Sequence, residues 1–219
     1  MKQYKTILCV LFLSGCTTVD LSKVAPGYTE AFKSMKNVFF GHHNNLITSE
    51  LIEKIPYASL AMNIGKGPKG LMILETRRDK KSTWVSADNV YLVETHGKII
   101  ETQGLNNNLD EILLTVDFSN LKEIDTDQTY TYFVTFSDPK LSNLKLEARF
   151  FKKEKQSVKL INQELSLMLI EENIFSPDLG WRFTNQYWID NNSFVWKSSQ
   201  TISPKVPRIN IEVTKKPSN

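Results

Sequence analysis

The sequence has very little cysteine or histidine. Only Cys9 and Cys16 among its 219 residues are cysteines, which is too few for a cysteine-rich zinc site. The three histidines are His42, His43 and His96, and no H-E-x-x-H spacing places two of them on one helix face. We therefore expect no metal site, and we find no motif that calls for a cofactor.

The sequence also lacks a long hydrophobic run near its start. The apolar stretch 6–13 has about eight residues, whereas a membrane-spanning helix needs roughly twenty. It follows Lys2 and Lys5 and precedes small residues, which are the three parts of an export signal. We expect residues 1–15 to be a removable signal peptide and not a permanent membrane span.

The end of this signal indicates a lipid anchor at Cys16. Leu13-Ser14-Gly15-Cys16 resembles the lipobox of bacterial lipoproteins, in which signal peptidase II cleaves before a diacylated cysteine. Two or three acyl chains on one residue hold a protein stably on a membrane. Because Cys9 lies in the signal, the mature chain keeps no free thiol and can form no disulfide.

Neither charge sign is in clear excess. The full chain has 27 Lys and Arg against 24 Asp and Glu, and removal of Lys2 and Lys5 leaves 25 against 24. A nucleic-acid binder usually carries a strongly basic patch or stripe. We expect no nucleic-acid partner.

Residues 16–45 are expected to form a lipidated tether with one short helix. Pro26 suits a first helical turn, and Gly41 ends a stretch in which apolar residues recur at helical spacing: Tyr28, Phe32, Met35 and Phe39. A second short helical turn is expected over 48–54, ended by Pro56. Residues 46–216 then form a single β-rich domain.

The apolar periodicity of this domain changes from helical to two. Runs rich in Val, Ile, Thr, Tyr and Phe alternate with turn residues about every ten positions. His96-Gly97 and Asn191-Asn192 each suit a two-residue hairpin turn, and no long crossover helix is available for a parallel sheet. The fold class is therefore mainly β, an antiparallel barrel-like or sandwich domain with one or two short N-terminal helices. The expected strands are 57–64, 71–76, 83–87, 90–95, 98–103, 112–118, 129–137, 145–152, 157–171, 183–190, 193–201 and 208–214.

No catalytic motif withstands inspection. Residues 65–70 read G-x-G-x-x-G, but Pro68 removes a backbone donor and the next residues suit a strand, so a hairpin turn is the better interpretation. S-x-x-K occurs at the frequency expected by chance, and G-x-S-x-G is absent. A pair of carboxylates could still form a glycosidase site, and Asp88 is the acid to test first.

The tryptophans can be explained in two ways. Trp84, Trp181, Trp188 and Trp196 all lie in or beside expected strands, where packing in the core is the favoured role. Aromatic faces also stack on sugar rings, so a saccharide contact stays open as the alternative. The short charge clusters at 77–81 and 152–155 are expected to be exposed hairpin tips, and contact with an anionic polysaccharide or lipid headgroup stays open for them.

Several separate blocks of residues occur in order along the chain. They are Ile55-Pro56-Tyr57-Ala58-Ser59, Ile64-Gly65, Gly67-Pro68, Trp84-Val85-Ser86-Ala87-Asp88, Gly97-Lys98-Ile99-Ile100, Thr102-x-Gly104-Leu105, Asn185-x-Tyr187-Trp188, Val195-Trp196-x-Ser198-x-Gln200, Pro204 and Pro207. These blocks resemble the YjbF/GfcB family of group 4 capsule polysaccharide lipoproteins, and the resemblance covers about residues 17–216.

The chain departs from the family pattern at two positions. The family usually has arginine after the hairpin glycine, and this chain has Lys98, which keeps the charge but lacks the planar fork needed for a bidentate contact. The family also commonly has glycine after the Ala-Asp of the tryptophan block, where this chain has Asn89. Asparagine tolerates the same left-handed turn.

On physical grounds, the motif residues of these blocks fall into three groups. Turn formers are Pro56, Gly65, Gly97 and Gly104, and the expected core contains Tyr57, Trp84, Trp188 and Trp196. The polar residues that could bond locally are Ser86, Asp88, Asn185 and Gln200.

The resemblance implies a barrel-like domain with a role in producing or exporting capsule or exopolysaccharide. It implies no reaction and no catalytic residue. The expected partners are an outer-membrane β-barrel and periplasmic proteins of an export system, together with the membrane through the lipid and, as an open alternative, the polysaccharide itself. The candidate partner or glycan contacts are Trp84, Asp88, Asn185, Trp188 and Gln200.

Two further functions stay open from the sequence, a periplasmic carbohydrate-active enzyme and a sugar-binding module. The expected location is the outer membrane, facing the periplasm. Lipoprotein sorting commonly retains in the inner membrane those chains with aspartate after the lipidated cysteine, and this chain has Thr17.

Overall fold

The structure, a computed structural model, describes residues 47–217. Cys16, the signal peptide and the helix expected after Pro26 lie outside the described residues. Helix α2 (Ser49–Lys54) confirms the helical turn expected over 48–54. The Thr48 side chain accepts a hydrogen bond from the backbone N–H of Leu51 at 3.3 Å and caps the first turn. No helix in this part of the chain is long and apolar enough to cross a membrane.

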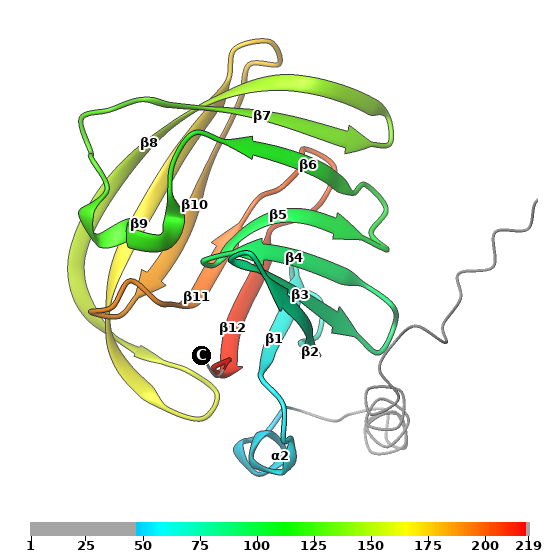
Figure 1. Cartoon of the computed structure of the whole chain (residues 1–219), viewed down its shortest axis with the longest axis vertical. Helices are drawn as coiled ribbons and strands as arrows, with labels where there is room; N and C mark the ends of the chain where they lie inside the picture. Colours follow the sequence, from blue (N-terminus) through cyan, green and yellow to red (C-terminus); the bar gives the residue numbers. More distant parts are fainter. Residues whose placement is uncertain (1–46, 218–219) are drawn as a thin grey trace, which may run out of the picture. The chain divides into compact units, whose positions relative to one another are not determined.

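Twelve strands form one antiparallel sheet (Figure 1). They are β1 (Ser59–Ile64), β2 (Gly70–Arg78), β3 (Lys81–Ser86), β4 (Tyr91–Thr95), β5 (Lys98–Gln103), β6 (Leu109–Leu114), β7 (Tyr130–Ser137), β8 (Lys140–Lys159), β9 (Glu164–Ser176), β10 (Trp181–Ile189), β11 (Val195–Gln200) and β12 (Ile209–Lys215). A 3₁₀ helix, η2 (Phe118–Glu123), lies between β6 and β7.

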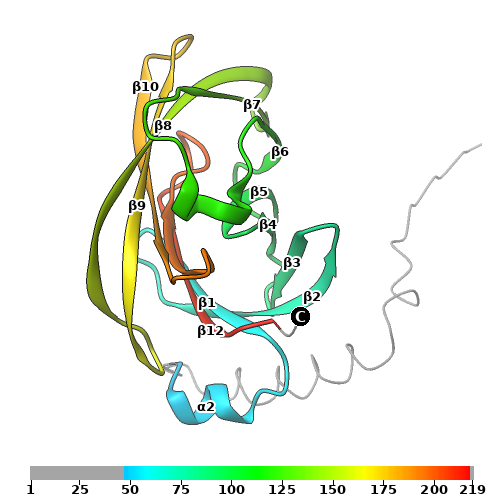
Figure 2. The same cartoon turned by 60° about the vertical axis from the view of Figure 1, so that its left-hand side comes forward.

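The strand order makes a nearly closed up-and-down barrel. Consecutive strands pair with each other, β12 returns to pair with β1, and the two ends of the sheet are β5 and β6. These two edge strands lie side by side in both views (Figures 1 and 2). Across this seam the backbone N–H of Leu109 donates to the Thr102 hydroxyl at 2.9 Å. The mainly β, antiparallel, barrel-like fold predicted from the sequence is therefore confirmed.

Alternation along the strands separates the barrel interior from its outer face. On β7 the residues Tyr130, Tyr132, Val134 and Phe136 are buried, and the residues between them are partly or fully exposed. The interior core includes the fully buried Trp84, Phe150 and Tyr187. Helix η2 contributes Phe118, whose ring meets those of Phe150 and Tyr187 edge-on at 5.8 and 5.7 Å.

Two turns predicted from the sequence are confirmed. His96 and Gly97 have φ values of 47° and 84° and join β4 to β5, as a two-residue hairpin turn requires. The 65–70 segment joins two strands, which rules out the helix a dinucleotide site would need.

Several expected strand boundaries were wrong, and the structure gives the reason for three of them. Ser193, with φ of 61°, extends the Asn191-Asn192 turn, because the Asp190 carboxylate accepts the N–H groups of Asn192 and Phe194. The strand expected over 157–171 is two strands, joined by a turn in which the N–H of Leu160 donates to the Gln163 carbonyl. Apolar residues continue through that turn, so the sequence pattern does not show that one strand ends and the next begins there. The strand expected over 112–118 ends at Leu114, since Asp117 caps η2.

Candidate functional site

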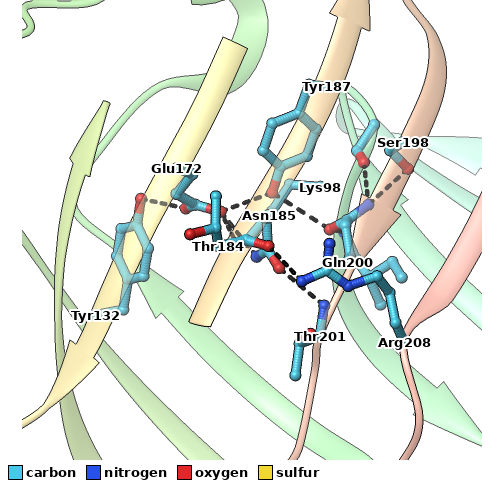
Figure 3. Close-up of polar contacts among 12 residues, drawn as sticks. Lys98, Tyr132, Glu172, Thr184, Asn185, Tyr187, Ser198, Gln200, Thr201 and Arg208 are labelled. Carbon is cyan, nitrogen blue, oxygen red and sulfur yellow. Dashed lines mark hydrogen bonds and ion pairs between the residues drawn. The ribbon is translucent and has the colours of Figure 1, made fainter. Parts of the chain in front are cut away.

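A fully buried carboxylate organises the barrel interior (Figure 3). Glu172 on β9 accepts hydrogen bonds from the ammonium of Lys98 at 2.7 Å, the hydroxyls of Tyr132 and Tyr187 at 2.8 and 2.7 Å, and the amide of Asn185 at 2.9 Å. We call Lys98, Tyr132, Glu172, Asn185, Tyr187 and Gln200 the Glu172 cluster. Each of these residues is buried.

Five strands supply these side chains. Glu172 and Asn185 are direct cross-strand partners on β9 and β10, and Tyr187 follows two residues later on the same inner face. Tyr132 comes from β7. Lys98 comes from β5, the edge strand on the other side of the barrel, so its ion pair with Glu172 joins two walls that share no hydrogen-bond ladder.

Gln200 secures the same edge strand from β11. Its side-chain oxygen accepts the N–H of Ile99 at 3.1 Å, and its nitrogen donates to the Gly97 carbonyl at 2.7 Å. Asn185 adds a further bond by accepting the N–H of Thr201 at 2.8 Å. Gln200 thus bonds the backbone at the start of the edge strand β5, and Asn185 fixes the chain just after β11.

The electrostatics of the cluster favour a structural role. Burial lowers the pKa of Lys98, and the neighbouring Glu172 carboxylate opposes that shift. Three aromatic rings, those of Phe118, Tyr132 and Tyr187, lie 5.4 to 5.9 Å from the ammonium. Four donors from the barrel itself bond the Glu172 carboxylate, three of them at Oε2 and one at Oε1. The charge of this buried carboxylate is therefore compensated within the barrel.

The two tyrosines predict a loss of stability at high pH. Burial, followed by the Glu172 carboxylate, raises the pKa of Tyr132 and Tyr187 well above the usual 10.0. The folded protein keeps both phenols protonated at a pH where the unfolded chain ionises them. Stability is therefore complete below pH 10 and falls above it, by about 1.4 kcal/mol per pH unit for each tyrosine.

Urea unfolding between pH 10.5 and 11.5 measures this slope. The lowered pKa of Lys98 acts in the opposite direction, and this effect fades as the pH rises above 10.5, where the unfolded chain also loses the lysine proton. The Tyr132→Phe variant should lose about half of the slope, because one phenol remains. An unchanged slope in that variant would show that Tyr132 ionises normally in the folded state.

The structure brings together only two of the five candidate contact residues, Asn185 and Gln200. Trp84 on β3 lies in the interior core with 2% of its surface exposed, as predicted. Asp88 lies exposed in the turn between β3 and β4. The Ser86 hydroxyl, and not Asp88, accepts the N–H of Val90 in that turn, so the bonding role considered for Asp88 belongs to Ser86.

The prediction that Trp188 and Trp196 build the core was wrong. Both are partly exposed and pack against a small cluster of Val158, Leu160 and Leu167 that is separate from the interior core. The cause is alternation: the neighbouring Tyr187 points inward, which turns Trp188 outward. Tyr57, also expected in the core, is only partly buried.

Sequence reasoning missed Glu172 and Tyr132 as members of a site. A usable signal existed for Glu172, because it falls in period two between the inward-facing Ile170 and Ile174. A carboxylate in phase with core residues indicates a buried partner. The sequence could not show that this partner is Lys98, 74 positions away.

A second feature is a cavity beside the turn between β4 and β5, which we call the turn cavity. Its lining includes Arg77, Lys80, Trp84, Glu94, His96 and Trp196. Glu94 accepts the N–H of Gly97 and, at 3.4 Å, the indole N–H of Trp84. Burial raises the pKa of Glu94. Among residues 47–217, no group of three His, Cys, Asp or Glu side chains could hold a metal ion.

Comparisons with known proteins agree with this architecture. Residues 32–214 match the family described as group 4 capsule polysaccharide lipoprotein gfcB, YjbF. The chain is 25% identical over 203 residues to the uncharacterized lipoprotein YjbF of Escherichia coli K12, covering 91% of each chain. It is 24% identical over 186 residues to the uncharacterized lipoprotein GfcB of the same organism, covering 83% of this chain and 82% of GfcB.

A solved structure shares the fold. The crystal structure of the hypothetical lipoprotein YmcC from Escherichia coli K12 superposes with a TM-score of 0.74 at 20% identity, covering 86% of this chain and 97% of YmcC. The class of protein that the fold defines is thus a nearly closed antiparallel barrel of the kind seen in YmcC.

The chain belongs to the YjbF/GfcB family of group 4 capsule polysaccharide lipoproteins. Membership makes it a lipoprotein of the cell envelope with a link to capsule polysaccharide, and it confirms the resemblance seen in the sequence. At the position where relatives usually have arginine, Lys98 contacts one oxygen of Glu172, and Tyr132 takes the other.

Proposed function

We propose that this protein is a non-enzymatic accessory factor in the production or export of capsule or exopolysaccharide. Lipid on Cys16 holds it at the outer membrane, where it faces the periplasm. Its partners are an outer-membrane β-barrel and periplasmic proteins of the export system. The observation that supports an accessory role most directly is the Glu172 cluster, because all four donors to this buried carboxylate come from the barrel itself and hold its strands together.

The anchor is tested by a Cys16→Ala variant. We expect it to lose palmitate labelling, to leave the membrane fraction, and to reduce the polysaccharide at the cell surface as much as deletion of the protein does, since the periplasmic partners then lose a tethered component. Cys9→Ala is the matched control, because Cys9 is removed with the signal and labelling should be unchanged. A Cys16→Ala protein that stays unlabelled on the membrane would show that the anchor is something else.

The absence of catalysis is tested with purified wild-type protein. Incubation with the polysaccharide of its own organism should leave the chain length and substitution of that polymer unchanged. Shortening of the polymer would replace the accessory role with an enzymatic one. Co-purification from solubilised outer membranes, in the absence of glycan, should recover the partner proteins.

A further inference from the structure

The turn cavity has no role in holding the barrel closed, and its lining is half apolar and half polar. Its wall is made by strands from opposite parts of the chain, including β3, β4, β11 and β12. We propose that the turn cavity binds one residue of an acidic saccharide. This inference rests on the proposed function and adds a ligand to it.

The apolar half suits the face of a sugar ring. Trp84, Phe194 and Trp196 line the cavity, and the rings of Phe194 and Trp196 meet edge-on at 5.0 Å. The indole N–H of Trp196 donates to Asp190 at 3.0 Å, which fixes the orientation of that ring. Aromatic rings held in this way can pack on the C–H face of a pyranose.

The polar half offers hydrogen-bonding groups. The Nε2 atom of His96 is the one buried side-chain polar atom within the described chain that has no hydrogen-bond partner. A buried polar atom without a partner is costly, and a ligand hydroxyl in the cavity would satisfy it. The hydroxyl of Ser82 and the carboxyl of Glu94 lie in the same lining.

The charges around the cavity favour an anion. Arg77 and Lys80 line it, and both act electrostatically on His96. Lys216 adds a third cation, with its ammonium 4.1 Å from the Phe194 ring centre and 5.9 Å from that of Trp196. Against these stand Glu94, whose pKa is raised by burial, and Asp117, which also acts on His96. Asp190, bonded to Trp196, is a third carboxylate, and Lys197 in the lining is a fourth cation. Cations therefore outnumber carboxylates around the cavity by four to three.

Isothermal titration with tetragalacturonate tests the proposal, and maltotetraose serves as the neutral probe. The full-length mature protein should bind tetragalacturonate with a dissociation constant at least about fivefold lower than that for maltotetraose. A fivefold difference corresponds to the contribution of about one exposed ion pair. Lys80→Asn should raise that constant about fivefold. Asparagine suits the left-handed φ of 68° at position 80, so the turn should be kept. His96→Asn, at another left-handed position, should also weaken binding.

Lys81→Gln is the matched control. Lys81 is the next residue and equally exposed, but it lines a different, outer-face groove. Equal weakening by Lys80→Asn and Lys81→Gln would place binding elsewhere and overturn the proposal, as would equal affinity for both probes or no binding of tetragalacturonate. Binding only to anionic phospholipid vesicles would assign the cavity to a lipid instead. If saccharide binding is absent but deletion still impairs export, the cavity inference fails and the accessory role stands.

Discussion

Replacing Glu172 with glutamine is expected to lower the free energy of unfolding by about 3 to 5 kcal/mol, the cost of leaving a buried charge without its partner. Glutamine keeps the shape of the side chain but not its charge. The Lys98 ammonium, with 4% of its side chain exposed, would then face a neutral group in the barrel interior. Urea unfolding followed by far-UV circular dichroism at pH 7 measures the loss.

Glu171→Gln provides a matched control one residue away. Glu171 points outward, pairs with Lys153 at 3.3 Å, and is partly exposed. The loss should stay below about 1 kcal/mol, as is typical of surface ion pairs. Adding Lys98→Met to Glu172→Gln should recover part of the stability, because it removes the uncompensated charge. Equal losses at positions 171 and 172 would contradict the structural role of the cluster.

Replacing Trp84 with alanine is expected to cost about 3 to 5 kcal/mol, through loss of buried apolar surface and the cavity left behind. Trp84 is 2% exposed and is the largest of the fully buried side chains among the described residues. Thermal unfolding of the purified variant should show a markedly lower Tm.

Trp188→Ala supplies the comparison for this prediction. Trp188 belongs to the same family blocks but lies on the outer face, where the Lys197 ammonium covers its ring at 5.1 Å. The Trp188→Ala substitution should lower the free energy of unfolding by about 1 kcal/mol, as an average substitution does. If Trp188→Ala proved as damaging as Trp84→Ala, the outer cluster would be as important to folding as the interior.

The Glu172 cluster explains how a barrel with an open seam can hold its shape. Strand β5 has a hydrogen-bonded neighbour on one side only. Lys98 reaches across the interior to Glu172, and Gln200 bonds the backbone at Gly97 and Ile99. Because Gly97 approaches Val195 so closely that a Cβ would lie 2.5 Å from its Cβ, no other residue fits without movement. The turn after β4 is thus held from β9 and β11 together.

The sequence by itself determined the local structure. Period-two alternation located most of the strands, because alternate residues of a strand face opposite sides, but it did not separate β8 from β9. Pairs such as His96-Gly97 located turns, because few residues adopt a left-handed backbone. Family blocks singled out Asn185 and Gln200, which the structure places in one cluster.

Only the tertiary structure decided which face of each strand is the interior and which distant residues meet there. Alternation separates Tyr187 from Trp188 but does not say which is inside, since aromatic side chains suit both faces. The turn after β8 packs against Trp188 on the outer face. It is held there because Ile161 and Asn162 bond to Glu212 and Thr214 of β12. Closure of the sheet brings Lys98 to Glu172. It depends on the curvature of twelve strands together, so the sequence of no single strand predicts it.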